Sequence, residues 1–173
     1  MLRRAFPTLL AGAVLTLALA CGKGEPRRSD AALGETFSSP DAAVTAVLDA
    51  LAAKDLAGLQ ALALSEQQFR GVVWPELPSS RPEVNLPFDY AWGTLQQNSR
   101  ANLAMTVREH GGRRYRLRRV DLGQDSTKYR TFAVHRDVAV VVTDEDGKER
   151  RLHLFGSMLE HGQGWKIFSY VVD

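Results

Sequence analysis

Helical and strand-forming patterns occupy different halves of this chain of 173 residues. Between Ser39 and Leu64, apolar residues recur at the i, i+3, i+4 and i+7 spacing of half-buried helices. From Arg114 onward, five runs are rich in β-branched and aromatic residues, with hairpin signals at Asp146-Gly147 and Gly162. Short turns join antiparallel neighbours, because parallel strands need long crossovers. The order therefore predicts an α+β domain, with N-terminal helices packed on one face of a curved antiparallel sheet.

Capping residues predict where these helices begin and end. Ser39 is the expected N-cap of the first helix, and Asp55 is that of a short second helix. Ser65 opens a third helical turn with a capping box. A longer helix is expected from about Phe88 to Glu109, where the pair Gly111-Gly112 ends it.

An apolar run before the lone cysteine, Cys21, predicts how the chain is divided. Arg3 and Arg4 precede a segment, residues 5–20, that carries no charge. This segment is shorter than the roughly 18 to 20 apolar residues that a spanning helix needs. A charged start, an apolar middle and small residues before a break are typical of a secretory signal peptide. We expect residues 1–20 to be this signal peptide, 21–36 a flexible polar tether and 37–173 a single domain.

The segment Ala18-Leu19-Ala20-Cys21 resembles the lipobox of bacterial lipoproteins, with alanine where leucine is favoured. The resemblance implies that Cys21 becomes the first mature residue and carries diacylglycerol on its thiol and a further acyl chain, such as palmitate, on its amine. Two or three acyl chains hold a protein firmly at a bilayer. Gly22 follows the cysteine, which by the family rule implies an outer-membrane location facing the periplasm of a Gram-negative envelope. The alternative is that Cys21 merely ends an ordinary secretory leader.

Charge and cysteine content exclude several classes of function. The chain has 22 Lys and Arg against 20 Asp and Glu, and the leader contains Arg3 and Arg4, so the mature part is formally neutral. A neutral, exported domain is a poor candidate for binding nucleic acid. With Cys21 acylated, no thiol remains for a disulfide or a zinc site. No two histidines have the i, i+2 strand spacing or the i, i+4 helical spacing that a metal site favours. We therefore expect no metal and no cofactor.

The order of elements is similar to that of nuclear transport factor 2-like (cystatin-like) domains. The similarity lies in two early helices separated by Lys54-Asp55 and in a final aromatic run, "GWKIFSYVVD", after a Gly turn. It implies helices lying in the bowl of a bent sheet, but it implies no activity, because such a fold hosts enzymes, binders and scaffolds alike. The ketosteroid isomerases of this superfamily pair an acidic base with tyrosine donors. The two early helices here contain no tyrosine, so we expect a non-enzymatic domain.

The strongest charge pattern is the run RRYRLRR around Tyr115. On a strand, Arg114, Arg116 and Arg118 share one face, while Tyr115 and Leu117 point toward the core. Such a stripe can contact anionic lipid headgroups, lipopolysaccharide phosphates or an acidic partner. The alternative is a solvated outer face that protects a sheet edge from unwanted pairing.

Two tryptophans are further candidate contacts for a ligand or partner. Trp92 lies on a stripe of the long helix that turns polar toward Ser99, and Trp165 lies on the last strand. They either border a cavity for a small apolar ligand or fill the core. The sequence thus predicts a lipid-anchored envelope protein that acts as a binding or interaction module, with an envelope protein or a second copy as partner. A carrier of a small apolar ligand and a ketosteroid-isomerase-like enzyme are the alternatives.

Overall fold

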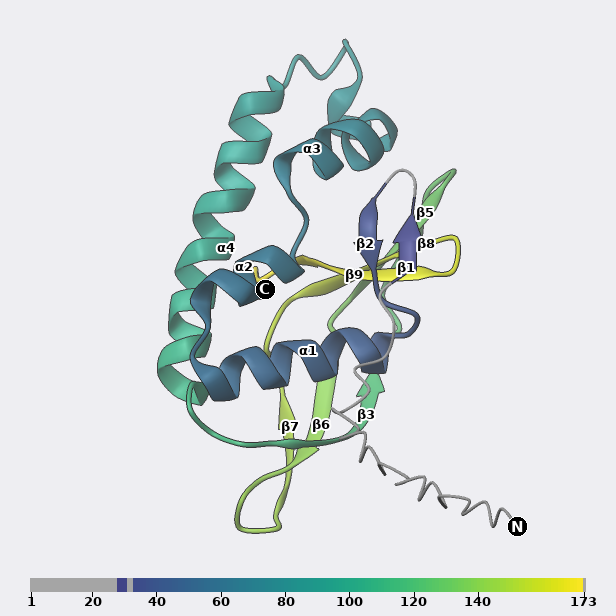
Figure 1. Cartoon of the computed structure of the whole chain (residues 1–173). Helices are drawn as coiled ribbons and strands as arrows, with labels where there is room; N and C mark the ends of the chain where they lie inside the picture. The colour runs from purple at the N-terminus through teal and green to yellow at the C-terminus, as the bar shows by residue number, and fades with distance from the viewer. Residues whose placement is uncertain (1–27, 31–32, 173) are drawn as a thin grey trace, which may run out of the picture.

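The computed structural model describes residues 28–30 and 33–172 (Figure 1). The predicted signal peptide, Cys21 and most of the predicted tether lie outside these residues. The described part is an α+β structure with helices packed against antiparallel sheets, as the sequence predicts. Among the described helices, none is both long and apolar enough to cross a bilayer.

The helical segments lie between residues 40 and 110. Their bounds are α1 Pro40–Ala53, α2 Leu56–Leu62, α3 Glu66–Gln68, the π-helical turn η1 Phe69–Val73, the 3-10 turns η2 Trp74–Glu76 and η3 Pro78–Ser80, and α4 Phe88–His110. The predicted caps are confirmed. The backbone N–H of Ala42 donates to Ser39 Oγ at 3.1 Å, and that of Gly58 donates to Asp55 Oδ1 at 2.9 Å. Ser65 forms its capping box with Gln68.

The strands form a hairpin and two larger antiparallel sheets. Their bounds are β1 Arg28–Asp30, β2 Gly34–Thr36, β3 Arg116–Asp121, β4 Ser126–Lys128, β5 Phe132–Arg136, β6 Ala139–Thr143, β7 Glu149–Leu152, β8 Ser157–His161 and β9 Gly164–Ser169. The hairpin is β1-β2, the three-stranded sheet has the order β3-β6-β7, and the four-stranded sheet has the order β4-β5-β8-β9. Two larger sheets therefore stand where the sequence predicted one.

One predicted strand run, from Arg150 to His161, is divided between the two sheets. β7 ends at Leu152 and β8 begins at Ser157. The residues between them include Leu154 and Phe155, which are buried in the core, so this segment leaves one sheet and enters the other.

Ordered structure begins before the predicted domain boundary at Phe37. The hairpin β1-β2 lies within the segment predicted as a flexible tether, and it precedes α1, so the helices are not strictly N-terminal. Leu33 is fully buried in a cluster with Leu64 and Phe69. The hairpin joins the four-stranded sheet through Phe37, which exchanges two 2.8 Å backbone hydrogen bonds with Trp165.

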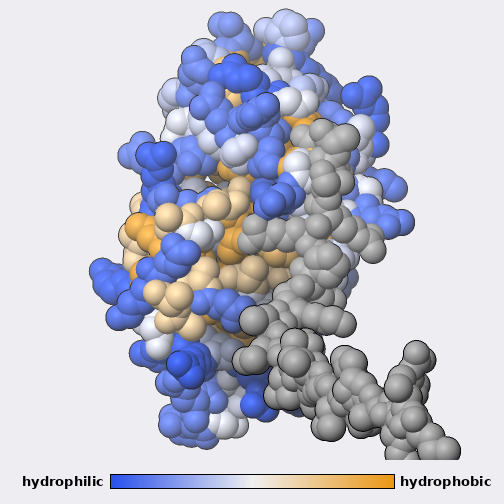
Figure 2. Space-filling model, viewed as in Figure 1, coloured by the Kyte–Doolittle hydropathy of each residue, from blue (hydrophilic) through white to orange (hydrophobic). Residues whose placement is uncertain are grey.

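Two hydrophobic cores support the fold. The first packs α1, α2 and the C-terminal half of α4 against the three-stranded sheet and β9, and Tyr170 is almost completely buried in it. The second packs η1 and the N-terminal half of α4 against the four-stranded sheet and contains the ring of Phe69. Figure 2 shows apolar side chains gathered over α1 and α2, between two more hydrophilic ends of the molecule.

A single hydroxyl in the first core offers a test of this packing. The hydroxyl of Tyr170 donates to the carbonyl oxygen of Leu59 at 2.7 Å. Burial raises the pKa of Tyr170 above its usual value, so the hydroxyl stays neutral. We predict that Tyr170→Phe lowers the free energy of unfolding by about 1 to 3 kcal/mol, because it leaves a buried acceptor without its donor. Urea denaturation measures this change. Tyr90→Phe is the matched control, since Tyr90 is 66% exposed, and an equal effect of both variants would contradict the prediction.

Candidate basic surface and ligand groove

Arg116 and Arg118 of the arginine stripe lie on β3, and Arg114 lies two residues before it. β3 pairs with β6 on one side and forms an edge of its sheet. Tyr115 and Leu117 pack against the first core, while Arg114, Arg116 and Arg118 are exposed, as strand alternation predicts. The register with β6 shifts between Leu117 and Arg119. This bulge places Arg118 and Arg119 on the surface together, because the inserted residue interrupts the alternation.

Some arginines of this sheet are neutralised by carboxylates. Arg119 Nε lies 3.1 Å from Asp121, which also binds Arg151 of β7. Arg150 Nε lies 2.9 Å from Asp144. The hydrogen bonds from Arg151 and Arg150 lower the pKa values of Asp121 and Asp144 respectively, so both carboxylates are ionised at neutral pH.

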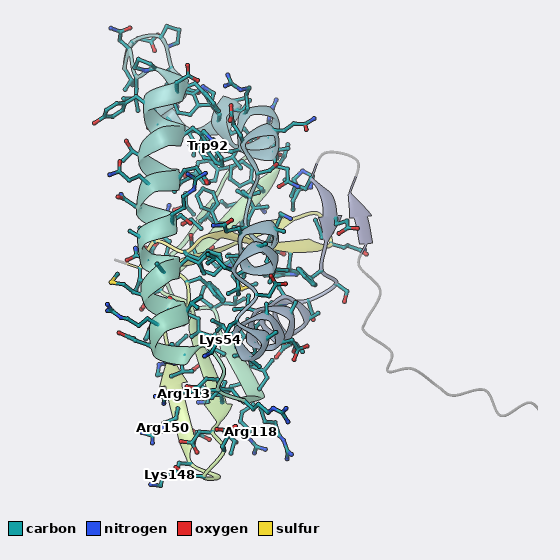
Figure 3. The ribbon with its side chains drawn as sticks, turned by 60° about the vertical axis from the view of Figure 1, so that its left-hand side comes forward. Lys54, Trp92, Arg113, Arg118, Lys148 and Arg150 are labelled. Carbon is teal, nitrogen blue, oxygen red and sulfur yellow. The ribbon has the colours of Figure 1, made fainter. Side chains whose placement is uncertain are left out.

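Other cations of the same region have no such partner. We define the basic surface as the following five residues: Arg113, Arg114, Arg116, Arg118 and Lys148. Within the part of the chain that the structure describes, none of these five forms an ion pair. Figure 3 shows Arg113, Arg118 and Lys148 at one end of the molecule, beyond the last turn of α4. Acidic residues 144–146 of the β6–β7 turn border this surface.

A hollow of about 340 Å³ lies beside the basic surface, between the end of α4 and the β6–β7 turn. His110 Nδ1 and the Tyr115 hydroxyl lie 3.0 Å apart in a hydrogen bond within it. Burial lowers the pKa of His110, Arg113 lowers it further, and Glu109 opposes both effects. The imidazole is therefore held neutral near pH 7. His110 is only 19% exposed at its side chain, although it adjoins a Gly turn.

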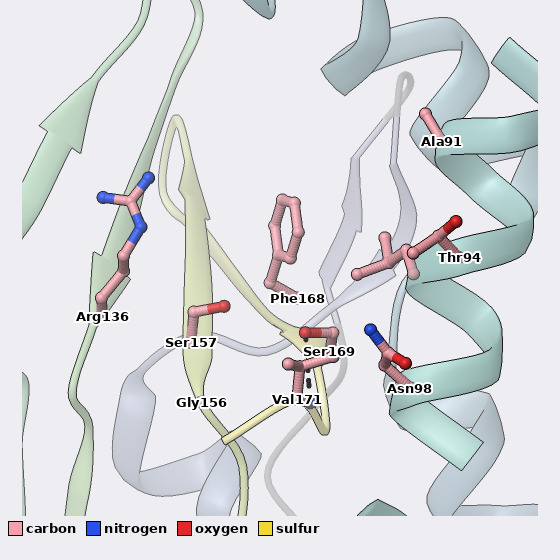
Figure 4. Close-up of a pocket in the computed structure, with 10 residues that line it drawn as sticks. Ala91, Thr94, Asn98, Arg136, Gly156, Ser157, Phe168, Ser169 and Val171 are labelled. Atoms are coloured by element: carbon pink, nitrogen blue, oxygen red, sulfur yellow. Dashed lines mark hydrogen bonds between the residues drawn. The ribbon is translucent and has the colours of Figure 1, made fainter. Parts of the chain in front are cut away.

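A second depression, of about 350 Å³, lies between α4 and the four-stranded sheet. Figure 4 shows Thr94 and Asn98 of α4 on one side and Arg136 and Ser157 of neighbouring strands on the other, with the ring of Phe168 between them. We call this depression the groove. In the sequence, the groove is marked only by the change from apolar to polar residues along the long helix.

The structure does not bring the two candidate tryptophans together. The Trp92 ring lies 5.3 Å from that of Phe69 in the second core, measured between centroids. The Trp165 ring lies 5.2 Å from that of His135, on the other face of the four-stranded sheet. Neither residue lines the groove or the hollow. Cys21 lies outside the described residues, and in the part described no three His, Cys, Asp or Glu side chains are grouped as metal ligands.

Comparisons with protein-family models, with curated proteins and with solved structures gave no match.

The buried imidazole makes the stability of the fold depend on pH. His110 has a lowered pKa when folded, so the unfolded chain binds its proton more readily. We predict that the melting temperature falls as the pH is lowered from about 7.5 to about 5.5, through the ordinary histidine pKa of about 6.5. His110→Gln should reduce this fall. Calorimetry at several pH values measures it, with His153→Gln, at a more exposed histidine, as the control. A pH dependence that His110→Gln leaves unchanged would contradict the assignment.

Proposed function

We propose that this chain is a lipid-anchored lipoprotein of a bacterial envelope, whose domain is a non-enzymatic interaction module of the nuclear transport factor 2-like type. Acylation of Cys21 holds the domain at the outer membrane, facing the periplasm. The basic surface then binds anionic phosphates of lipid headgroups. The observation that carries this proposal is a contrast between neighbouring cations. Arg119, Arg150 and Arg151 have carboxylate partners, whereas the five cations of the basic surface have none among the described residues.

The physical argument rests on local rather than total charge. A formally neutral domain is not attracted as a whole to an anionic bilayer, so binding must come from cations that are close together and uncompensated. Each such cation is attracted to an anionic leaflet, and the energy of this attraction falls off within a Debye length of the leaflet surface. An acyl anchor raises the effective concentration of the domain at the leaflet, so weak contacts there suffice.

Two features favour an interaction module over the alternatives. Leu59, Leu103 and Tyr170 fill the core between α2, α4 and β9, which does not favour a carrier with an apolar ligand enclosed at this place. The lowered pKa values of Asp121 and Asp144 arise mainly from their hydrogen bonds with Arg151 and Arg150. Perturbed carboxylates of this kind are typical of structural ion pairs.

The fold part of the proposal has support in the arrangement of the elements. α1 and α2 pack against each other and follow one another through Lys54 and Asp55, as the resemblance implies. The last strand, β9, follows a tight Gly turn and carries Trp165. A single curved sheet that holds both helices is the further feature that a nuclear transport factor 2-like domain would have.

Vesicle binding tests the basic surface. We predict that the unacylated chain, residues 21–173 with Cys21→Ser, sediments with phosphatidylglycerol vesicles and not with phosphatidylcholine vesicles. Replacing Arg114, Arg116 and Arg118 by Gln should weaken this binding by about 10- to 100-fold, because three cations leave the leaflet surface. Raising the salt concentration should weaken it as well.

The matched control removes three exposed cations elsewhere, by replacing Arg81, Arg100 and Lys128 with Gln. This variant has the same net charge as the test variant, so it should bind like the unsubstituted chain. Equal losses in both triple variants, or equal binding to both kinds of vesicle, would contradict the proposal. If the basic surface binds an acidic protein instead, the unsubstituted chain should capture that protein from native membranes. The variant that lacks Arg114, Arg116 and Arg118 should not capture it.

Metabolic labelling tests the anchor separately. We predict that the full chain, produced in a Gram-negative host, incorporates a palmitate analogue and fractionates with the outer membrane. Cys21→Ala should abolish the label, because the acylated sulfur is lost. An unlabelled full-length chain in the cytosol, with its leader attached, would contradict the proposal.

A further inference from the structure

A row of polar residues crosses the four-stranded sheet at the groove. Arg136 of β5 pairs in register with Ser157 of β8, and Ser157 pairs with Ser169 of β9. Residues that lie directly opposite each other in a sheet point to the same face. The row therefore places a guanidinium and two hydroxyls along one line, facing α4.

A β-bulge shapes the floor of the groove. The register moves from Ser157 opposite Ser169 to Met158 opposite Ile167, so Phe168 is the extra residue on β9. In a regular strand, Phe168 and Ser169 would point to opposite faces, but here both line the groove. The bulge thus sets an aromatic ring beside the polar row. The rings of Phe168 and Phe69 meet edge to face, with 6.3 Å between their centroids.

One face of α4 forms the opposite wall. Its lining residues are spaced i, i+3, i+4 and i+7: Ala91, Thr94, Leu95 and Asn98. Ser99, the next residue, accepts a 3.1 Å hydrogen bond from the backbone N–H of Tyr170, which fixes the end of β9 against the helix. Within the described structure, the side chains of Thr94, Asn98 and Ser157 have no hydrogen-bond partner, so their donors remain available to a ligand.

Arg136 is held in place but keeps free donors. Its Nη1 donates to Thr127 Oγ1 at 2.7 Å and lies 3.4 Å from Asp125 Oδ1. In the part of the chain described, nothing accepts from its Nε or Nη2. A guanidinium fork that is oriented through one nitrogen can still bind a carboxylate through the other two.

Gly156 closes the end of the groove. A Cβ at this position would lie 1.6 Å from the carbonyl oxygen of Val171, so only glycine permits the C-terminal segment to cross here. Beyond this crossing lies a separate depression that contains Asp125 and Asp137. These carboxylates disfavour an anion more strongly on that side of Arg136 than on the groove side, because the repulsion between like charges falls with distance.

From these observations we infer that the groove binds a small organic carboxylate with a planar apolar body. The carboxylate accepts from Arg136 and Ser157, the body lies against Phe168 and Leu95, and a polar substituent reaches Thr94 or Asn98. A wholly apolar ligand would cover these polar groups without pairing them, which is unfavourable. The volume of about 350 Å³ lies at the small end of the range for small-molecule sites. This site does not depend on the lipid anchor or on the basic surface.

Matched probes test the inference by ligand-detected NMR on the full chain in a non-ionic detergent. The probes are phenylacetate and 4-hydroxyphenylacetate, with phenylacetamide as the neutral control of the same shape. We expect the carboxylates to bind at least about tenfold more tightly than the amide, because only they form charge-assisted hydrogen bonds. The 4-hydroxyl should improve binding, and Asn98→Ala should remove that improvement.

Variants then locate the binding. Arg136→Gln should abolish the preference for carboxylate over amide, and Arg136→Lys should restore part of it. Asn98→Asp, at an exposed helix position, should weaken the carboxylates but not the amide, so it tests the site even if Arg136→Gln fails to fold. Arg150→Gln, an arginine of the hollow with one carboxylate partner, should change nothing. Any one of three results overturns the inference. They are equal affinity for the carboxylates and the amide, no binding of either carboxylate at about 10 mM, and an effect of Arg150→Gln equal to that of Arg136→Gln.

Discussion

Hydrogen bonds from β9 and the residues just after it hold the rest of the structure together. Trp165 pairs with Phe37 and thereby attaches the N-terminal hairpin, and the carbonyl oxygen of Ile167 accepts from Leu64 after α2. One residue after β9 ends, the backbone N–H of Tyr170 donates to the hydroxyl of Ser99 in α4. Because these polar groups are buried, each must find a partner. The need to satisfy them fixes the hairpin, the helices and the sheet in one arrangement, from which both the groove and the two cores follow.

Features encoded by neighbouring residues could be predicted from the sequence, and features that depend on distant residues could not. Ser39 and Asp55 cap helices through residues three positions later, so their role is visible in the sequence. The burial of Leu33 depends on Leu64 and Phe69, far along the chain, so the polar sequence around it predicts a flexible tether rather than a hairpin. The groove depends on a bulge at Phe168, and no local pattern reveals which residue of a strand is the extra one.

Register also decides which arginines are left without a partner. The run around Tyr115 is rich in arginine throughout, yet the shift at the bulge brings Arg119 to Asp121, which also binds Arg151. Arg116 lies on the edge strand with nothing acidic bound to it in the described structure. Charges on an edge strand oppose pairing with another sheet. Protection of the edge and attraction to phosphate are therefore compatible uses of the same side chains.

The early start of the hairpin limits how far an anchored domain can travel. Only six residues, 22–27, lie between Cys21 and Arg28, where β1 begins. Even fully stretched, the seven Cα–Cα steps from Cys21 to Arg28 span no more than about 25 Å. A body tied to a leaflet by so short a connection would remain within roughly its own diameter of the lipid surface. A binding partner of such an anchored domain would then have to lie close to the bilayer, because the domain could not reach partners deeper in the periplasm.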